Sequence, residues 1–215
     1  MSFLNQLKSQ AQTMQAQQTA DQQSQLQQVE AVERATHQAW RYLDELAAQL
    51  CVLQPDGPRL SADGKTPWPA MRASDFRVDA RRKMVQGREL FDYVVMAWTL
   101  MPKMGVVVQG SVNGALLAEM EQIESRLAVG QVAFERFEKR IPPRNSLQST
   151  RYDYQTHARG MVRIQPHHAT GVLEFRLVCV TGLEARSKSV NAAAFPPVLL
   201  DELAKLIVGQ GSTFL

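Results

Sequence analysis

The sequence contains little cysteine and no long apolar run. Only two cysteines, Cys51 and Cys179, occur in 215 residues, which excludes a fold built on a disulfide framework. No apolar stretch reaches the roughly 18–20 residues that cross a bilayer, so we expect no transmembrane helix and no membrane insertion. The N-terminus lacks the basic segment and apolar core of a signal peptide. We therefore expect a cytoplasmic protein.

Motifs of common enzymes are also absent. There is no Walker phosphate loop, no Gly-x-Gly-x-x-Gly dinucleotide motif and no Gly-x-Ser-x-Gly elbow. His157, His167 and His168 lie close in sequence, but adjacent histidines on a hairpin point apart and no Cys-x-x-Cys accompanies them. Cys179 falls on an apolar strand face, where a thiol is buried and inert. We expect no metal and no cofactor, and a catalytic role has no residue-level support.

Residues 1–54 have the composition of one long helix. They contain neither glycine nor proline, and 11 of the first 28 residues are glutamine. The sequence Pro55-Asp56-Gly57-Pro58 then stops the helix. At 1.5 Å per residue such a helix is about 80 Å long. A helix of that length needs a partner, because isolated helices gain most of their stability from packing.

The apolar spacing indicates where this helix packs. Between Leu26 and Leu50 the pattern alternates three- and four-residue steps, which predicts a buried seam with Trp40 and Leu43 at its centre. A second stretch, residues 4–14, has the same spacing but is offset and mostly surrounded by polar residues. We hypothesise a coiled-coil-like rod for self-association, with a dimer favoured. The alternative is a polar tail before an ordinary helix over residues 28–53. The candidate interface residues are Leu26, Val29, Trp40, Leu43 and Leu50.

The rest of the chain indicates an α+β fold. Residues 55–74 hold four prolines and two glycines, which predicts a linker that Trp68 anchors to the body. Residues 75–215 combine period-2 strand patterns with two helical patterns, so we expect a mostly antiparallel sheet with one or two packed helices. Segment 131–141 fits either a continued helix or a strand. The predicted strands lie at 76–84, 90–101, 106–108, 150–165, 173–179 and 183–190, and the predicted helices at 116–127 and 198–208.

A basic segment is the best candidate for binding. Residues 136–163 carry seven basic and two acidic side chains, an excess larger than the net charge of +3 of the whole chain. Alternation along 150–165 predicts one long strand that places its basic side chains on one exposed face. Such a face would bind phosphates, unless its arginines pair with acids such as Glu174. The candidate anion-binding residues are Arg151, His157, Arg159 and Arg163.

Two short motifs resemble those of PilZ domains, which bind cyclic dinucleotides. Arg77-Val78-Asp79-Ala80-Arg81 has the Arg-x-x-x-Arg spacing of that family, and Gln109-Gly110-Ser111-Val112-Asn113-Gly114 is similar to its second motif. The resemblance implies a β-barrel and a nucleotide ligand held by guanidiniums and a tight Ser/Gly turn. Residue 109 is glutamine where the family has Asp or Asn, and a helical pattern follows where the family continues with strands.

Two functional hypotheses follow. The first is a non-enzymatic interaction or assembly protein that self-associates through its N-terminal helix and presents a sheet face to a protein partner. The alternative is an anion-binding module for a nucleotide or nucleic acid that uses the basic strand face. Salt distinguishes them, because phosphate binding weakens steeply with ionic strength whereas an apolar helical interface does not.

Overall fold

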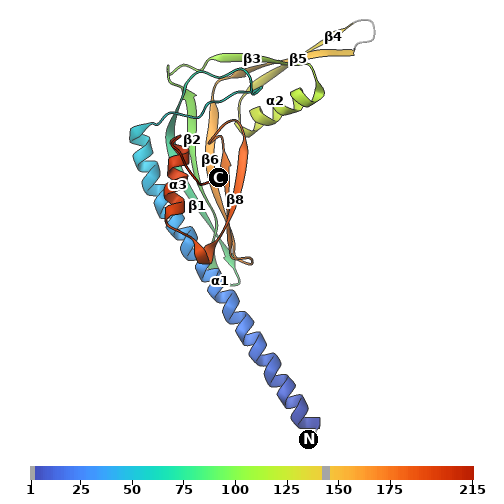
Figure 1. Cartoon of the computed structure of the whole chain (residues 1–215), viewed down its shortest axis with the longest axis vertical. Helices are drawn as coiled ribbons and strands as arrows, with labels where there is room; N and C mark the ends of the chain where they lie inside the picture. The colour runs from blue at the N-terminus through green and yellow to red at the C-terminus, as the bar shows by residue number, and fades with distance from the viewer. Residues whose placement is uncertain (1–2, 142–145) are drawn as a thin grey trace.

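The computed structural model describes residues 3–141 and 146–215 and has the predicted α+β fold, with a long N-terminal helix and antiparallel sheets (Figure 1). In chain order the elements are α1 (Phe3–Leu53), β1 (Met71–Val85), β2 (Arg88–Pro102), β3 (Gln109–Gly114), α2 (Leu117–Val129), β4 (Phe134–Ile141), β5 (Ser146–Gln155), β6 (Ala158–His167), β7 (Val172–Val178), β8 (Ala185–Asn191), the short 3-10 helix η1 (Ala192–Ala194) and α3 (Val198–Ile207). No helix of the described residues has the length and hydropathy needed to span a membrane.

The strands form two sheets. The larger has the order β1-β2-β6-β7-β8 and the smaller the order β3-β5-β4, and every pair is antiparallel. Figure 1 shows α1 and α3 on one side of the five-stranded sheet, whereas α2 lies beside the three-stranded sheet. Tyr42 on α1 donates a hydrogen bond to Asp201 on α3, with 2.8 Å between the oxygens. The five-stranded sheet is therefore covered by two helices on one face.

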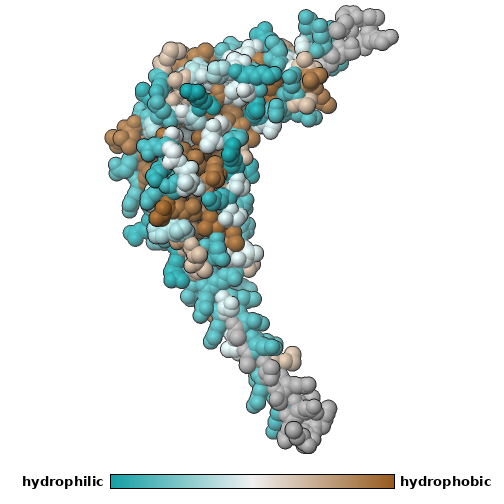
Figure 2. Space-filling model, viewed as in Figure 1, coloured by the Kyte–Doolittle hydropathy of each residue, from teal (hydrophilic) through white to brown (hydrophobic). Residues whose placement is uncertain are grey.

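The two halves of α1 differ in their surroundings. From Val32 to Leu50 one stripe is buried against the sheet, whereas every side chain over 21–27 is exposed. The N-terminal half projects away from the body (Figure 1), and the residues of it that Figure 2 colours are mostly hydrophilic. Among the described side chains of α1, the first to form a tertiary hydrogen bond is Gln28, whose Nε2 donates to the carbonyl oxygen of His168 at 2.9 Å. Packing therefore supports only the second half of this helix within its own chain.

The predicted seam has the right period, but its centre needs correction. Ala39 and Leu43 are fully buried, whereas Trp40 is only partly buried. The Trp40 ring lies at the flank, with its centroid 5.5 Å from that of His37 and 6.3 Å from that of Phe91. Small side chains such as Ala39 allow a helix to approach a sheet closely, and the large indole is left at the edge of that contact.

The predicted strand 150–165 is in fact two strands in different sheets. Thr156 causes the break, because it is held by the segment that precedes β3. Its Oγ1 and its backbone N–H both donate to the carbonyl oxygen of Val108, at 2.8 and 2.9 Å, and the N–H of Val108 donates back to Oγ1 at 2.9 Å. β5 ends just before Thr156, and β6 starts two residues later in the larger sheet. Apolar and polar residues still alternate on each side of the break, but the two halves belong to different sheets and do not form the predicted single face.

Other sequence predictions have mixed outcomes. Segment 131–141 contains a strand, β4, because Phe134 to Ile141 pair with β5. The predicted strand at 106–108 is wrong, since β3 starts only at Gln109. Trp68 anchors the linker as predicted: it is 7% exposed and its ring stacks on Tyr154 with the centroids 5.3 Å apart. The helices predicted at 116–127 and 198–208 are confirmed as α2 (Leu117–Val129) and α3 (Val198–Ile207).

Candidate functional site

The face of the five-stranded sheet opposite α1, here called the outer face, is the best candidate for binding. Cross-strand partners share a face, so the strand register identifies its side chains. One row is apolar and joins Ala97, Met161 and Val178. The outer face comprises Arg77, Asp79, Arg81, Tyr93, Val95, Ala97, Thr99, Arg159, Met161, Arg163, Gln165, Glu174, Arg176, Val178, Ser187 and Ser189. Five arginines thus accompany two acids, which gives this face a positive charge.

Arg163 and Arg176 lie directly opposite each other in the β6–β7 ladder. The Arg163 guanidinium lies 4.4 Å from the centroid of the Tyr93 ring, and its Nη2 donates to Oε1 of Gln165 at 3.1 Å. Neither arginine forms an ion pair with any residue that the structure describes. Like charges placed opposite each other destabilise a sheet. This pair therefore favours an anion near the two arginines.

The alternative of pairing with acids holds for Arg151, which pairs with Asp153, but among the residues that the structure describes Glu174 pairs with none of the arginines of the outer face. The carboxylate of Glu174 lies 3.2 Å from Nε2 of His167, and both side chains are more than 40% exposed. Glu174 faces Gln165 in the ladder, one row beyond Arg163 and Arg176. The register of β6 and β7 explains this outcome, because it places Arg176 rather than an acid opposite Arg163.

A groove lies where the C-terminal end of α2 meets the outer face. Its volume is about 650 Å³. The turn after α2 is held in place, because the carbonyl oxygen of Gly130 accepts a hydrogen bond from the N–H of Arg159 at 2.9 Å. A Cβ atom at residue 130 would lie 2.7 Å from a methyl carbon of Leu183, so only glycine fits there without a shift. The groove is lined by Ser125, Ala128, Val129, Gln131, Met161, Arg163, Gln165, Glu174, Arg176 and Val178.

The four predicted anion-binding residues do not form one site. Arg159 and Arg163 lie on the outer face, whereas Arg151 lies on β5 in the other sheet. Arg151 holds Asp153 through two hydrogen bonds of 2.7 and 2.6 Å, and this guanidinium is the main reason why the pKa of Asp153 is below its usual range. His157 lies in the break between β5 and β6. The sequence prediction missed Arg176, because its place opposite Arg163 depends on strand register.

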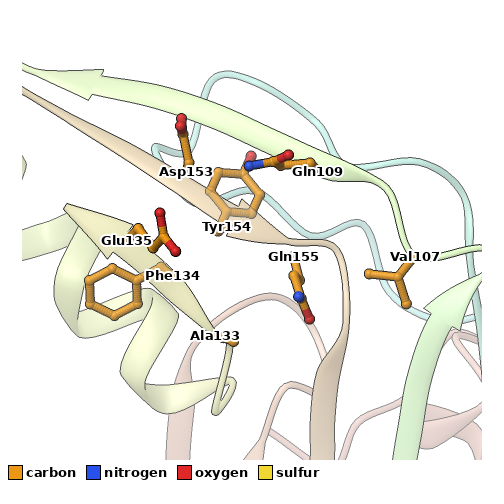
Figure 3. Close-up of a pocket in the computed structure, with 8 residues that line it drawn as sticks. All are labelled: Val107, Gln109, Ala133, Phe134, Glu135, Asp153, Tyr154 and Gln155. Carbon is orange, nitrogen blue, oxygen red and sulfur yellow. The ribbon is translucent and has the colours of Figure 1, made fainter. Parts of the chain in front are cut away.

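The three-stranded sheet carries a second hollow, of about 510 Å³ (Figure 3). Glu135 and Asp153 are cross-strand partners in its wall, together with the amides of Gln109 and Gln155. Arg151 already neutralises Asp153, and no cysteine, serine or histidine lines this hollow. Among the described residues no three His, Cys, Asp or Glu side chains gather to hold a metal ion. The hollow therefore offers two carboxylates and two amides, with the Asp153 carboxylate engaged by Arg151.

The candidate interface residues on α1 fall into two groups. Leu43 and Leu50 are buried in the core of their own chain. Val29 is partly buried, and Leu26 is 44% exposed at the point where the helix leaves the body. Trp40 is partly covered by His37 and Phe91. An interface between chains would therefore involve Leu26 and the residues before it.

The PilZ-like motifs lie in different sheets. Arg77 and Arg81 are on β1 of the five-stranded sheet, whereas Ser111 and Asn113 are on β3 of the three-stranded sheet. The sheets are open, with β1 and β8 at the edges of the larger one, so the barrel implied by the resemblance is not formed by the described strands. Comparison with family models, with curated proteins and with solved structures found no match to this chain.

Proposed function

We propose that this protein is a non-enzymatic assembly protein that self-associates through α1 and presents its outer face to a protein partner. One observation carries the proposal: α1 continues past Gln28 toward the N-terminus without support from the body (Figure 1). Residues 3–27 would extend roughly 38 Å at 1.5 Å per residue. A polar helix of that length is marginal alone in water, so a second helix alongside it would provide the missing contacts.

The short apolar seam of this projecting half favours a second copy of the same helix. Leu4, Leu7, Ala11 and Met14 follow steps of three, four and three residues, which is the spacing of a helix-to-helix seam. Met14 is 62% exposed and Leu26 is 44% exposed in the single chain. A second copy of the helix would cover the seam from Leu4 to Met14 and the exposed Leu26. A two-fold dimer is the commonest arrangement of identical chains.

Light scattering tests the self-association. The full chain should have about twice its mass of 24.1 kDa, as expected of a dimer. A chain that starts at Gln27 keeps the tertiary hydrogen bond of Gln28 and should be a monomer. The double variant Leu7→Glu, Met14→Glu should dissociate as well, whereas the control Ser9→Glu, Gln12→Glu adds the same charge off the seam and should not. Equal masses for the full and shortened chains would contradict the proposal.

The outer face supports the second part of the proposal, the binding of a protein partner. Its apolar row, Ala97, Met161 and Val178, crosses three adjacent strands, and arginines flank it. Val178 is only 7% exposed and Ala97 and Met161 are partly buried, so the row offers a narrow apolar strip rimmed by charge, a feature of interaction sites. The excess of arginine favours an acidic partner, since complementary charge accelerates encounter and orients docking.

A second candidate function is anion binding, and the cross-strand pair of arginines, Arg163 and Arg176, favours it. Titration of labelled nucleic acid and of a cyclic dinucleotide at low and moderate salt tests this function. A true phosphate site should bind saturably at low salt and weaken steeply as salt is added. Absence of saturable binding at low salt would remove this candidate and leave the assembly function.

A further inference from the structure

We propose that the groove between α2 and the outer face binds a small amphiphilic anion, a phosphate or carboxylate group joined to an unbranched apolar chain. The proposal rests on the anion-binding candidate above and adds the chemical class of the ligand. Three features of the groove support it: the position of its arginines, the position of its apolar side chains, and the polarity of the helix end that closes it.

The arginines provide the site for the anionic group. Arg163 and Arg176 are cross-strand partners and both line the groove. The ring of Tyr93 and the amide of Gln165 hold the Arg163 guanidinium in place. Gln165 is itself fixed, because its Nε2 donates to the carbonyl oxygen of Asp92 at 2.6 Å. A guanidinium positioned in this way loses little freedom when it binds a phosphate or carboxylate oxygen.

The apolar side chains provide the site for the chain of the ligand. Met161 and Val178 form the row next to the arginines, two residues closer to the start of β6. Ala128 and Val129 of α2 line the same cavity. A cavity of about 650 Å³ lies within the range of roughly 300–1,000 Å³ that small-molecule sites occupy. The groove is thus apolar beside α2 and basic one row further along the sheet.

The end of α2 determines the orientation of the ligand. A helix C-terminus carries the negative end of the helix dipole, which disfavours an anion near Val129. Arg159, the outer-face arginine on that side of the apolar row, is not among the residues that line the groove. Glu174 repels an anion from the opposite side, since it lies one row beyond the arginines. The anionic group therefore belongs between these two negative regions, at Arg163 and Arg176, with its chain extended toward α2.

Calorimetric titration at low salt tests the proposal with octyl phosphate and inorganic phosphate as probes. Octyl phosphate should bind at least about tenfold more tightly than inorganic phosphate, because burial of the alkyl chain adds affinity. The double variant Arg163→Gln, Arg176→Gln should lose at least about tenfold in octyl phosphate affinity, a loss of roughly 1.4 kcal/mol or more. Ala128→Glu should also weaken binding, since it adds an exposed negative charge at the apolar end without altering the core.

The matched control is the double variant Arg34→Gln, Arg41→Gln, which removes the same charge from exposed positions on α1, across the sheet from the groove. It should bind octyl phosphate as the unaltered chain does. Thermal melting of each variant verifies that it is folded. Equal affinity for the two probes would overturn the amphiphile proposal and leave anion binding intact. If neither probe binds, both the amphiphile proposal and the anion-binding function are overturned. Unchanged affinity in the groove variants would place the ligand elsewhere and overturn this assignment.

Discussion

Trp98 occupies the space that a side chain on Gly160 would need. The two residues are direct partners across the β2–β6 ladder, and a Cβ atom on Gly160 would lie 2.1 Å from the indole atoms Cε2 and Nε1. The Trp98 ring also stacks on Phe76, with the centroids 5.5 Å apart. One ring thus joins β1, β2 and β6 beneath the covered face of the sheet, and only glycine at residue 160 permits this arrangement.

Substitution of Gly160 should therefore destabilise the fold. Gly160→Ala forces the indole of Trp98 to move within a packed core, and overpacking of this kind costs about 1–3 kcal/mol or more. Chemical denaturation followed by circular dichroism measures the loss. Gly211→Ala is the control, because a Cβ atom there meets no neighbour within 4 Å. Equal denaturation midpoints for the two variants would contradict the packing described for Trp98.

The burial pattern of α1 predicts a graded effect of truncating its side chains. Leu43→Ala should cost about 2–5 kcal/mol of unfolding free energy, because this leucine is fully buried. Leu26→Ala should change the stability of the monomer by less than about 0.5 kcal/mol, because Leu26 is exposed. Trp40→Ala should fall between them, since its ring is only partly covered. Denaturation measured in the dissociated Leu7→Glu, Met14→Glu chain isolates these effects from self-association for all three residues. A larger loss for Trp40 than for Leu43 would contradict the placement of the seam.

The Arg151–Asp153 pair predicts a dependence of stability on pH. Arg151 is the main cause of the lowered pKa of Asp153, with a hydrogen bond from Ser111 as the next cause. A carboxyl group with a lowered pKa stabilises the folded state above its unfolded pKa of about 3.9, and this stabilisation is lost as pH falls through the folded pKa. In Arg151→Gln the carboxyl of Asp153 should titrate at a higher pH in an NMR titration. The stability difference between the two chains should shrink below about pH 4. An unchanged Asp153 titration would refute the role of Arg151.

The two thiols should react differently. Cys179 is fully buried, and burial raises the pKa of its thiol to about 12, so it should resist alkylation in the folded protein. Cys51 is exposed on α1 and should react without unfolding. Mass spectrometry after treatment with iodoacetamide at pH 8 should detect one modified cysteine in the native chain and two in denaturant. Modification of Cys179 in the native chain would contradict its burial.

The sequence by itself determined the elements whose signals are local. Helix α1 up to Leu53 follows from helix-forming residues, a three-and-four apolar spacing and the stop at Pro55. The alternation of buried and exposed residues along β6 was also visible, because the faces of a strand depend only on parity. Trp68 between two prolines identified the anchor of the linker. Each of these signals is contained in a short stretch of chain.

Only the tertiary structure decided the features that depend on distant partners. Val108 captures Thr156 and divides the predicted strand, so Arg151 belongs to one sheet and Arg163 to the other. Segment 134–141 is a strand because β5 pairs with it. Arg163 and Arg176 oppose each other because of the register of β6 and β7, and the C-terminal end of α2 lines the same groove as these arginines. Strand register and helix placement result from contacts between residues far apart in sequence, and no local pattern encodes them.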